Sequence, residues 1–430
     1  MNYYKRTADA LLQDLLDAFG AVLIEGPKWC GKTTTASQLA NSILRMQDPS
    51  MREEYLATAK TKPSILLKGD TPRLIDEWQD APMLWDAVRT TVDDRQIPGQ
   101  FILTGSNAVD KSQIHHSGAG RIARLRMLPM SLWESQESTG EVSLKELFNN
   151  PDYDIDGKMS KMTVEDLIFA ASRGGWPASL LARTPKAQLL VAKNYVQTIC
   201  SDDVSGIDGK KRDAKLTSMI LRAYARNVST LVKKKSLLDD VTSSGEVSCH
   251  VDTFDDYVSA LEKLFVIQNI SAWCPAIRSK TAIRSSVKRC FCDPSIPIAL
   301  LGLSPESLSM QLRTFGFIFE QMCIRDLKAY TIDLNSHVSY YHDRYDLEAD
   351  IVLHLEDGRY ALIECKLGSS EIDEGAKHIL ELKRLIQEHN KTEKQVPIRE
   401  PDLLIVMTGG TMAYSRPDGV KVIPLACLKD

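Results

Sequence analysis

The feature that most constrains the fold is a glycine-bounded loop between an apolar run and a helix-forming segment. Residues 21–39 read AVLIEGPKWCGKTTTASQL, in which the apolar run AVLI predicts a buried strand and the stretch after the loop favours a helix. The loop carries Gly26 and Gly31, with four residues between them, and Lys32 and Thr33 follow directly. A strand, a loop of this pattern and a helix, in this order, predict a site that wraps a polyphosphate.

The spacing has a chemical reason. Glycines let the backbone turn its N–H groups toward an anion, and the following helix presents its positive dipole end to the same anion. Lys32 is expected to reach the β- and γ-phosphates, and the Thr33 hydroxyl to bind Mg²⁺. The pattern therefore predicts ATP and Mg²⁺ as cofactors. The residues expected at the nucleotide are Gly26, Pro27, Lys28, Trp29, Cys30, Gly31, Lys32, Thr33 and Thr34.

A second apolar run ends in two acids about 45 residues after the loop. The sequence there is TPRLIDEWQ, and the acids are Asp76 and Glu77. In an ATPase of this kind, Asp76 is expected to hold the Mg²⁺ ion and Glu77 to polarise the attacking water. An apolar run followed by Asp-Glu marks only a strand end in most chains, so its position after the loop is what makes it informative.

A third predicted strand, QFILTGSN, ends in short polar side chains. At the carboxyl edge of a parallel sheet, where ligands bind, either Ser106 or Asn107 is expected to sense the γ-phosphate, and a simple turn is the alternative. A cluster of three arginines follows within six residues, at Arg121, Arg124 and Arg126. We interpret Arg121 as the candidate catalytic arginine, with a solvated basic face as the alternative.

Four stretches together resemble the prokaryotic AAA-type ATP-binding proteins that carry a C-terminal domain of unknown function. These stretches are GPKWCGKTTTA, RLIDEWQDAPMLWDAVR, GQFILTGSN and HSGAGRIARLRMLPMSLWES. The resemblance extends over nearly the whole chain and implies an α/β P-loop NTPase domain followed by a helical lid. It implies architecture more firmly than a biological role.

The middle of the chain predicts a winged helix-turn-helix. From Lys215 to Trp273 the pattern is three helices and an apolar strand, and a basic stretch without acids, residues 278–289, suits a wing. A wing of this kind could contact DNA phosphates. The presumed reading helix, however, carries Asp252, Asp255 and Asp256, which repel phosphates, so structural or protein-protein use is favoured.

The last part of the chain predicts a hairpin with charged residues near its strand ends. Asp350 begins one strand, Asp357-Gly358 makes the turn, and Glu364 and Lys366 end the return strand on one face. With a helix before and a helix and strand after, this order resembles the αβββαβ PD-(D/E)XK nuclease core, which is restriction-endonuclease-like. The resemblance implies a metal held by Glu320, Asp350 and Glu364, with Lys366 as the catalytic lysine, and a degenerate, inactive fold is the alternative.

Composition and charge limit the kinds of partner that the chain can have. A net charge of −4 excludes a general nucleic-acid coat, and the nine cysteines form no CxxC pair. We expect a cytoplasmic protein with reduced thiols, no signal peptide and no membrane segment; candidate partners besides ATP are DNA, a protein or further copies of the chain. The expected parts are an AAA-like ATPase domain (1–150), a lid and linker (151–213), a winged helix (214–295) and a nuclease-like domain (310–430).

Overall fold

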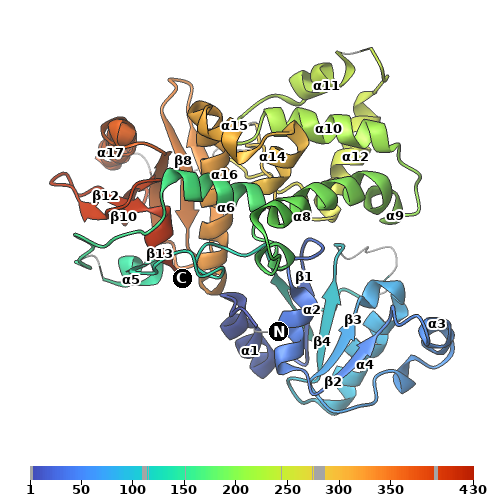
Figure 1. Cartoon of the computed structure of the whole chain (residues 1–430). Helices are drawn as coiled ribbons and strands as arrows, with labels where there is room; N and C mark the ends of the chain where they lie inside the picture. Colours follow the sequence, from blue (N-terminus) through green and yellow to red (C-terminus); the bar gives the residue numbers. More distant parts are fainter. Residues whose placement is uncertain are drawn as a thin grey trace. The chain divides into compact units, whose positions relative to one another are not determined.

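The computed structural model describes residues 3–108, 114, 116–150, 152–243, 245–273, 275, 286–391 and 396–430. The chain divides into two compact units (Figure 1). Unit 1 is Met1–Pro129 with Lys263–Phe265, and unit 2 is Met130–Glu262 with Val266–Asp430. The lid, winged-helix and nuclease-like parts expected from the sequence therefore lie in one compact unit. Within the described residues, no helix has both the length and the apolar character needed to cross a membrane.

Unit 1 is built on a 5-stranded parallel sheet in the order β2-β3-β4-β1-β5. The strands are β1 (Ala21–Glu25), β2 (Ser42–Arg45), β3 (Arg73–Asp76), β4 (Phe101–Gly105) and β5 (Ile122–Arg126). Its helices are α1 (Ala8–Ala18), α2 (Lys32–Leu39), α3 (Arg52–Thr61) and α4 (Met83–Arg95). The strand, loop and helix predicted for residues 21–39 are confirmed as β1, its loop and α2.

The core of unit 1 explains why its central strands read as continuous apolar runs. Every residue of β1 and β4 is buried, as expected for strands covered on both faces. Alternate side chains, among them Leu23 and Leu103, pack against a cluster that includes Trp78, Trp85 and Val88. Because β4 lies between β1 and β3, the end of β4 lies between the loop after β1 and the acids after β3.

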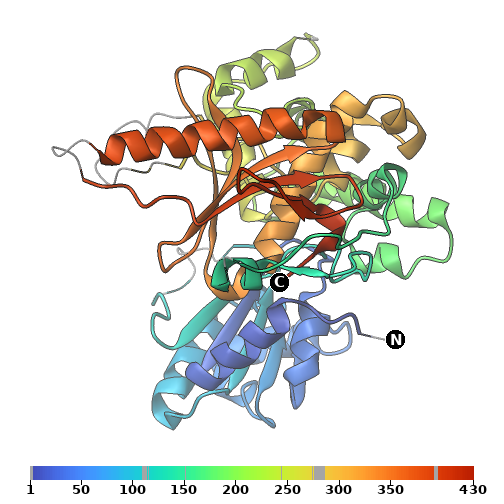
Figure 2. The ribbon, with the colours of Figure 1, turned by 90° about the vertical axis from the view of Figure 1, so that its left-hand side faces the viewer.

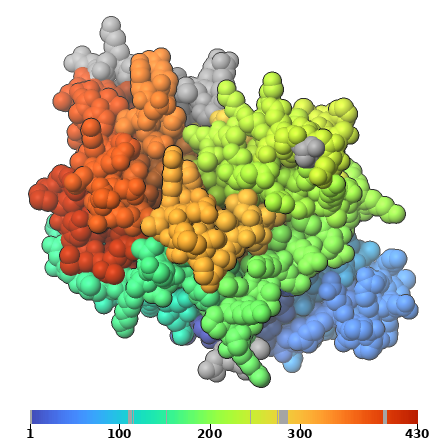
Figure 3. Space-filling view, turned by 45° about the horizontal axis from the view of Figure 1, so that its top comes forward, coloured from blue at the N-terminus to red at the C-terminus, as the bar shows by residue number. Residues whose placement is uncertain are grey.

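The first part of unit 2 is helical. Its helices are α5 (Leu144–Asn149), α6 (Val164–Arg173), α7 (Pro177–Leu180), α8 (Pro185–Thr198), α9 (Val204–Gly206), α10 (Ala214–Arg226), α11 (Lys234–Thr242), α12 (Val251–Lys263), α14 (Ser295–Leu301) and α15 (Pro305–Ser309). On the face shown in Figure 3, the light-orange part of the chain near residue 300 lies between the yellow-green part and the orange-red C-terminal part.

The three helices expected from the winged-helix pattern are present as α10, α11 and α12. Antiparallel bridges then join Ile267 to Phe291 and Ile270 to Lys288. Residues 276–285, which hold most of the expected wing, lie outside the described residues. The acids of α12 are paired locally, Asp255 with Lys234 and Asp256 with the Lys210 ammonium. Whether this module binds DNA stays a prediction.

The last part of unit 2 is a 6-stranded mixed sheet in the order β11-β12-β10-β9-β8-β7. Its strands are β7 (His337–His342), β8 (Glu348–His354), β9 (Tyr360–Lys366), β10 (Leu403–Thr408), β11 (Tyr414–Ser415) and β12 (Lys421–Pro424). Helix α16 (Leu312–Tyr330) packs on β7, β8 and β9, and α17 (Ile372–Asn390) runs across the sheet against β8, β9 and β10 (Figure 2). The predicted order of helix, three strands, helix and strand is present.

The segment around residues 130–150 belongs with unit 2 rather than with the ATPase domain expected to extend to residue 150. The short strand β6 (Val142–Ser143) pairs in parallel with β13 (Leu428–Lys429), close to the C-terminus. The backbone N–H of Thr139 also donates to the carbonyl of Ala426. The boundary predicted from the sequence is therefore about twenty residues too late.

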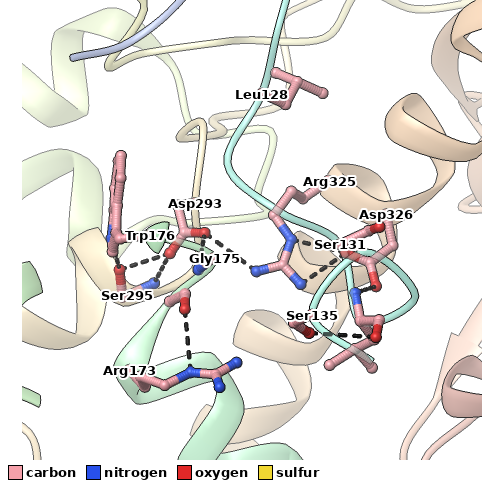
Figure 4. Close-up of polar contacts among 12 residues, drawn as sticks. Leu128, Ser131, Ser135, Arg173, Gly175, Trp176, Asp293, Ser295, Arg325 and Asp326 are labelled. Carbon is pink, nitrogen blue, oxygen red and sulfur yellow. Dashed lines mark hydrogen bonds and ion pairs between the residues drawn. The ribbon is translucent and has the colours of Figure 1, made fainter. Parts of the chain in front are cut away.

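A buried ionic network joins the helical part of unit 2 to α16 (Figure 4). The Arg325 guanidinium donates to Asp293 at 3.1 Å and to Asp326 at 2.7 Å, and all three side chains are almost fully buried. Asp293 also accepts from the backbone N–H of Gly175, and Asp326 accepts from that of Leu132. Four segments distant in sequence thus meet at one guanidinium, which explains why unit 2 is a single compact body.

Candidate functional site

The loop after β1 is held in the shape that its pattern predicts. Gly31 precedes α2 with a φ of 105°, and Trp29 has a φ of 65°. A Cβ at Gly26 would lie 2.2 Å from the carbonyl oxygen of Met127, so only glycine fits there. The buried Lys32 ammonium donates to the carbonyl oxygens of Gly26 and Pro27, at 3.0 and 2.9 Å. The loop therefore folds around the ammonium expected to meet the phosphates.

The Thr33 hydroxyl and the Asp76 carboxylate meet at the carboxyl edge of the sheet. Thr33 Oγ1 donates to Asp76 Oδ1 at 2.7 Å, and Thr104 Oγ1 donates to the same oxygen at 2.6 Å. This geometry follows from the strand order, because Thr104 in β4 is the register partner of both Ile24 and Asp76. A hydroxyl and a carboxylate are hard oxygen ligands of the kind that Mg²⁺ binds, so the two residues fit that ion.

Glu77 is held toward the end of β4 by two polar side chains. Its backbone is left-handed, with a φ of 56°, a conformation that costs a non-glycine residue on the order of 1–3 kcal/mol. Ser106 Oγ donates to Glu77 Oε2 at 3.2 Å, and the Gln79 amide donates to the same oxygen. The side-chain oxygen of Asn107 is buried and accepts no hydrogen bond from the described residues. Of the two candidate sensors of the γ-phosphate, Ser106 is therefore the one whose hydroxyl contacts Glu77.

The register of β5 separates the three arginines of the candidate cluster. Arg121 precedes β5 next to the amino end of β1 and donates to Asp93 at 2.7 Å. At about 3.3 Å per residue, the length of β5 puts Arg121 some 16 Å from the level of the loop, beyond the reach of its side chain. The structure therefore does not support Arg121 as the arginine that acts at its own loop. Arg126 is level with Glu25, directly before the loop, and lies 3.3 Å from its carboxylate.

Arg6 is a positioning residue that the sequence pattern does not reveal. It is 7% exposed, and its guanidinium donates to the carbonyl oxygens of Cys30 and Leu128, both at 2.7 Å. Tyr3, close by in sequence, shares a hydrogen bond with Thr35 of α2 at 2.9 Å. The phosphate loop is therefore braced from the segment before α1. A single arginine before an amphipathic helix gives no local signal of this role.

The C-terminal candidate site begins with the pair predicted on β9. Lys366 Nζ lies 3.1 Å from Glu364 Oε2, which confirms that the two side chains share a face. Gly375 of α17 allows close packing here, since a Cβ there would lie 3.1 Å from Lys366 Cγ. His378, also on α17, lies 3.6 Å from Glu364, a contact the sequence did not indicate. Glu364 is fully buried, and burial and the Asp350 charge raise the pKa of its carboxyl.

The other two predicted metal ligands contact a lysine from the middle of the chain. Asp350 Oδ2 accepts from the backbone N–H of Cys365 at 2.9 Å, which fixes β8 against β9. Lys288 forms a buried ion pair with Glu320 and lies 3.7 Å from Asp350 Oδ1. Within the described residues, no group of three or more His, Cys, Asp or Glu side chains is placed to hold a metal ion. The metal site at Glu320, Asp350 and Glu364 therefore stays a prediction.

Three family models match separate parts of the chain. Residues 18–136 match a model described as an AAA domain. Residues 164–307 and 315–428 match two models described as domains of unknown function, DUF8612 and DUF4143. The first match covers the loop and the acids described above, so this part of the chain is similar to the AAA domain of P-loop ATPases. It confirms that part of the resemblance inferred from the sequence motifs.

Curated relatives and solved structures add little about function. The uncharacterized protein Rv2008c of Mycobacterium tuberculosis is 24% identical over 366 residues, which span 83% of this chain and 72% of the relative, and Mb2031c of Mycobacterium bovis gives the same values. The Walker-type ATPase PABY2304 of Pyrococcus abyssi aligns at 12% identity with a TM-score of 0.41, over 70% of this chain and 96% of that chain. A signal transduction ATPase with numerous domains from Pyrococcus horikoshii aligns at 13% identity with a TM-score of 0.25, over 75% of this chain and 47% of that chain.

Proposed function

We propose that the chain binds ATP with Mg²⁺ at the loop after β1 and hydrolyses it slowly. The observation that carries the proposal is the 2.7 Å contact between Thr33 and Asp76, with Glu77 one residue further on. Thr33 lies in the first turn of α2, and Asp76 and Glu77 lie at the end of β3, so the fold brings them together at the edge where parallel strands bind ligands.

Each side chain has a role that its contacts support. Bound ATP and Mg²⁺ would supply the transferable phosphoryl group and the charge that stabilises its transfer. Lys32, which now donates to two loop carbonyls, would bind phosphate oxygens, and Thr33 and Asp76 would hold the ion. Glu77 orients the attacking water, and Gln79 and Ser106 keep its carboxylate aimed at the end of β4.

The sharpest test of this proposal is the Glu77→Gln variant. We expect it to bind ATP as the unchanged chain does but to hydrolyse it about 100-fold more slowly or worse, because an amide cannot polarise water as a carboxylate does. Binding is measured with a fluorescent ATP analogue and turnover by phosphate release. Glu53→Gln, an exposed change on α3, is the matched control. If Glu77→Gln hydrolyses ATP at the wild-type rate, another group must orient the attacking water.

Two hypotheses cover unit 2. In the first, nucleotide state controls a nuclease that acts on DNA through Asp350, Glu364 and Lys366. In the second, the nuclease-like fold is inactive and unit 2 is an interaction surface for a protein partner or for further copies of the chain. The ion pair between Lys288 and Glu320 supports the second, because it occupies the Glu320 carboxylate, which the first hypothesis would use as a further metal ligand. We therefore propose a nucleotide-switched binding protein.

DNA cleavage distinguishes the two hypotheses. We expect the full chain to leave supercoiled plasmid and single-stranded DNA intact with Mg²⁺ or Mn²⁺, whether or not ATP is present, because the ammonium of Lys288 already lies against Glu320 and Asp350. Cleavage is followed on gels over hours at several protein concentrations. Cutting that is present in the unchanged chain and lost in Lys366→Ala would instead establish a nuclease.

A further inference from the structure

The carboxylates of the C-terminal candidate site already hold a cation that belongs to the chain. Lys288 is 5% exposed, and its ammonium contacts the Glu320 carboxylate. It also donates to the backbone carbonyl of Asp350 at 2.9 Å and lies 3.7 Å from Asp350 Oδ1. An ammonium carries three N–H donors. The acceptors around the Lys288 ammonium are therefore the two side-chain carboxylates of Glu320 and Asp350 and the backbone carbonyl of Asp350.

The backbone around Lys288 is anchored on several sides. Its N–H and carbonyl both bond to Ile270, at 2.9 and 3.1 Å, and the N–H of the next residue, Arg289, donates to the carbonyl of Thr230. On the other side, the Tyr340 hydroxyl of β7 donates to the carbonyl of Ser286. The helical part of unit 2 therefore delivers this lysine to a site whose acids come from the C-terminal part.

The other acceptors of the site differ in how far they are used. Asp350 Oδ2 accepts from the N–H of Cys365, whereas the Glu364 carboxylate lies near Lys366 and His378 but accepts no hydrogen bond from the described residues. A Mg²⁺-like ion needs several open oxygen ligands in near-octahedral geometry. With Glu320 and Asp350 facing Lys288, the Glu364 carboxylate alone, among these three described acids, keeps unpartnered oxygens, and one carboxylate is too small a ligand set for such an ion.

The charges of the site lead to the same conclusion. Glu320, Asp350 and Glu364 face two ammonium groups, so little negative charge remains to attract a divalent ion.

We propose that Lys288 is an internal counter-ion that takes the place of a divalent metal ion and closes the C-terminal carboxylates to one. The carboxylates accept a hard divalent cation once the ammonium is removed. The inference does not depend on ATP binding by unit 1, since every residue it uses lies in unit 2.

The test uses the full chain without nucleotide, at pH 8, with Mn²⁺ as the probe. All samples carry Asp76→Asn, which removes the candidate ion ligand of unit 1. We expect Lys288→Met to gain one saturable Mn²⁺ site by calorimetric titration and to show a Tm that rises with Mn²⁺, because an ion that binds only the folded state stabilises it. The matched control, Lys377→Met, removes an exposed lysine from α17 and should show neither effect.

Two outcomes would overturn the proposal. One is a saturable Mn²⁺ site in the chain with Lys288 intact that disappears in Asp350→Asn. The other is a folded Lys288→Met chain that binds no Mn²⁺. If Lys288→Met folds poorly, the titration of the chain with Lys288 intact still tests the first outcome. For the second outcome, Lys288→Gln, which keeps an N–H donor, is then used in place of Lys288→Met. ATP binding is measured separately with Asp76 intact, so a failure of one proposal can be distinguished from a failure of the other.

Discussion

Replacing Lys32 by alanine is expected to lower ATP turnover by about 100- to 1,000-fold, the usual effect of removing one preorganised electrostatic contact to a developing charge. The buried ammonium has only loop carbonyls as partners among its described hydrogen bonds, so its charge is available for phosphates. Turnover is measured by phosphate release at saturating ATP, and affinity with a fluorescent ATP analogue.

Two controls accompany this variant. Lys60→Ala removes an exposed lysine of α3 and should leave both values unchanged. Lys32→Arg keeps the charge but alters its geometry, so it should recover part of the affinity and little of the rate. Full turnover in Lys32→Ala would remove the assignment of the phosphate loop.

The second large effect is on stability and concerns Arg325. We expect Arg325→Met to lower the free energy of unfolding by about 3–5 kcal/mol, because it leaves Asp293 and Asp326 buried without their counter-charge. For a unit of this size such a loss lowers Tm by roughly 10 °C. Calorimetric unfolding measures the change.

A matched surface change isolates the role of burial. Arg384 of α17 pairs with Glu381 and Glu388 but is half exposed, so Arg384→Met should barely move Tm. Equal effects of Arg325→Met and Arg384→Met would contradict the importance given to the buried network. A triple change that combines Arg325→Met with Asp293→Asn and Asp326→Asn should recover part of the loss, because no unpaired charge remains.

The sequence predicted those parts of the nucleotide site that are encoded in short, contiguous runs. The loop from Gly26 to Thr33 and the pair Asp76 and Glu77 each follow one strand, and strand direction alone brings them to one edge. The role of Gln79 was missed, because its amide contacts both Glu77 and Ser106 only when β4 lies next to β3. No local pattern specifies that order.

The distance of Arg121 from its own loop could not be predicted for a similar reason. Three arginines within six residues predict a basic strand, but only the register shows which of them reaches the loop. Arg121 and Arg126 lie at opposite ends of the same strand, so the first lies away from the phosphates and the second beside Glu25. Arginines that are close together in the sequence therefore lie at opposite ends of a strand in the parallel sheet.

The C-terminal site shows the same division between local and distant contacts. The hairpin was predictable, because the turn at Gly358 and the alternation along β9 are local. The contact of Lys288 was not, since 62 residues separate it from Asp350. Its residue type and position in a basic stretch suggested a phosphate contact, whereas the fold buries it among acids.

The position of Lys288 also constrains how this architecture can be inherited. The lysine falls within residues 164–307 and its acidic partners within residues 315–428, so one ion cluster spans two separately recognised families. A recombination event that transferred the second segment alone would leave Glu320 buried without its counter-charge. Recombination of these two segments should therefore give a stable protein only when both are transferred together, or when Glu320 and Lys288 are both replaced.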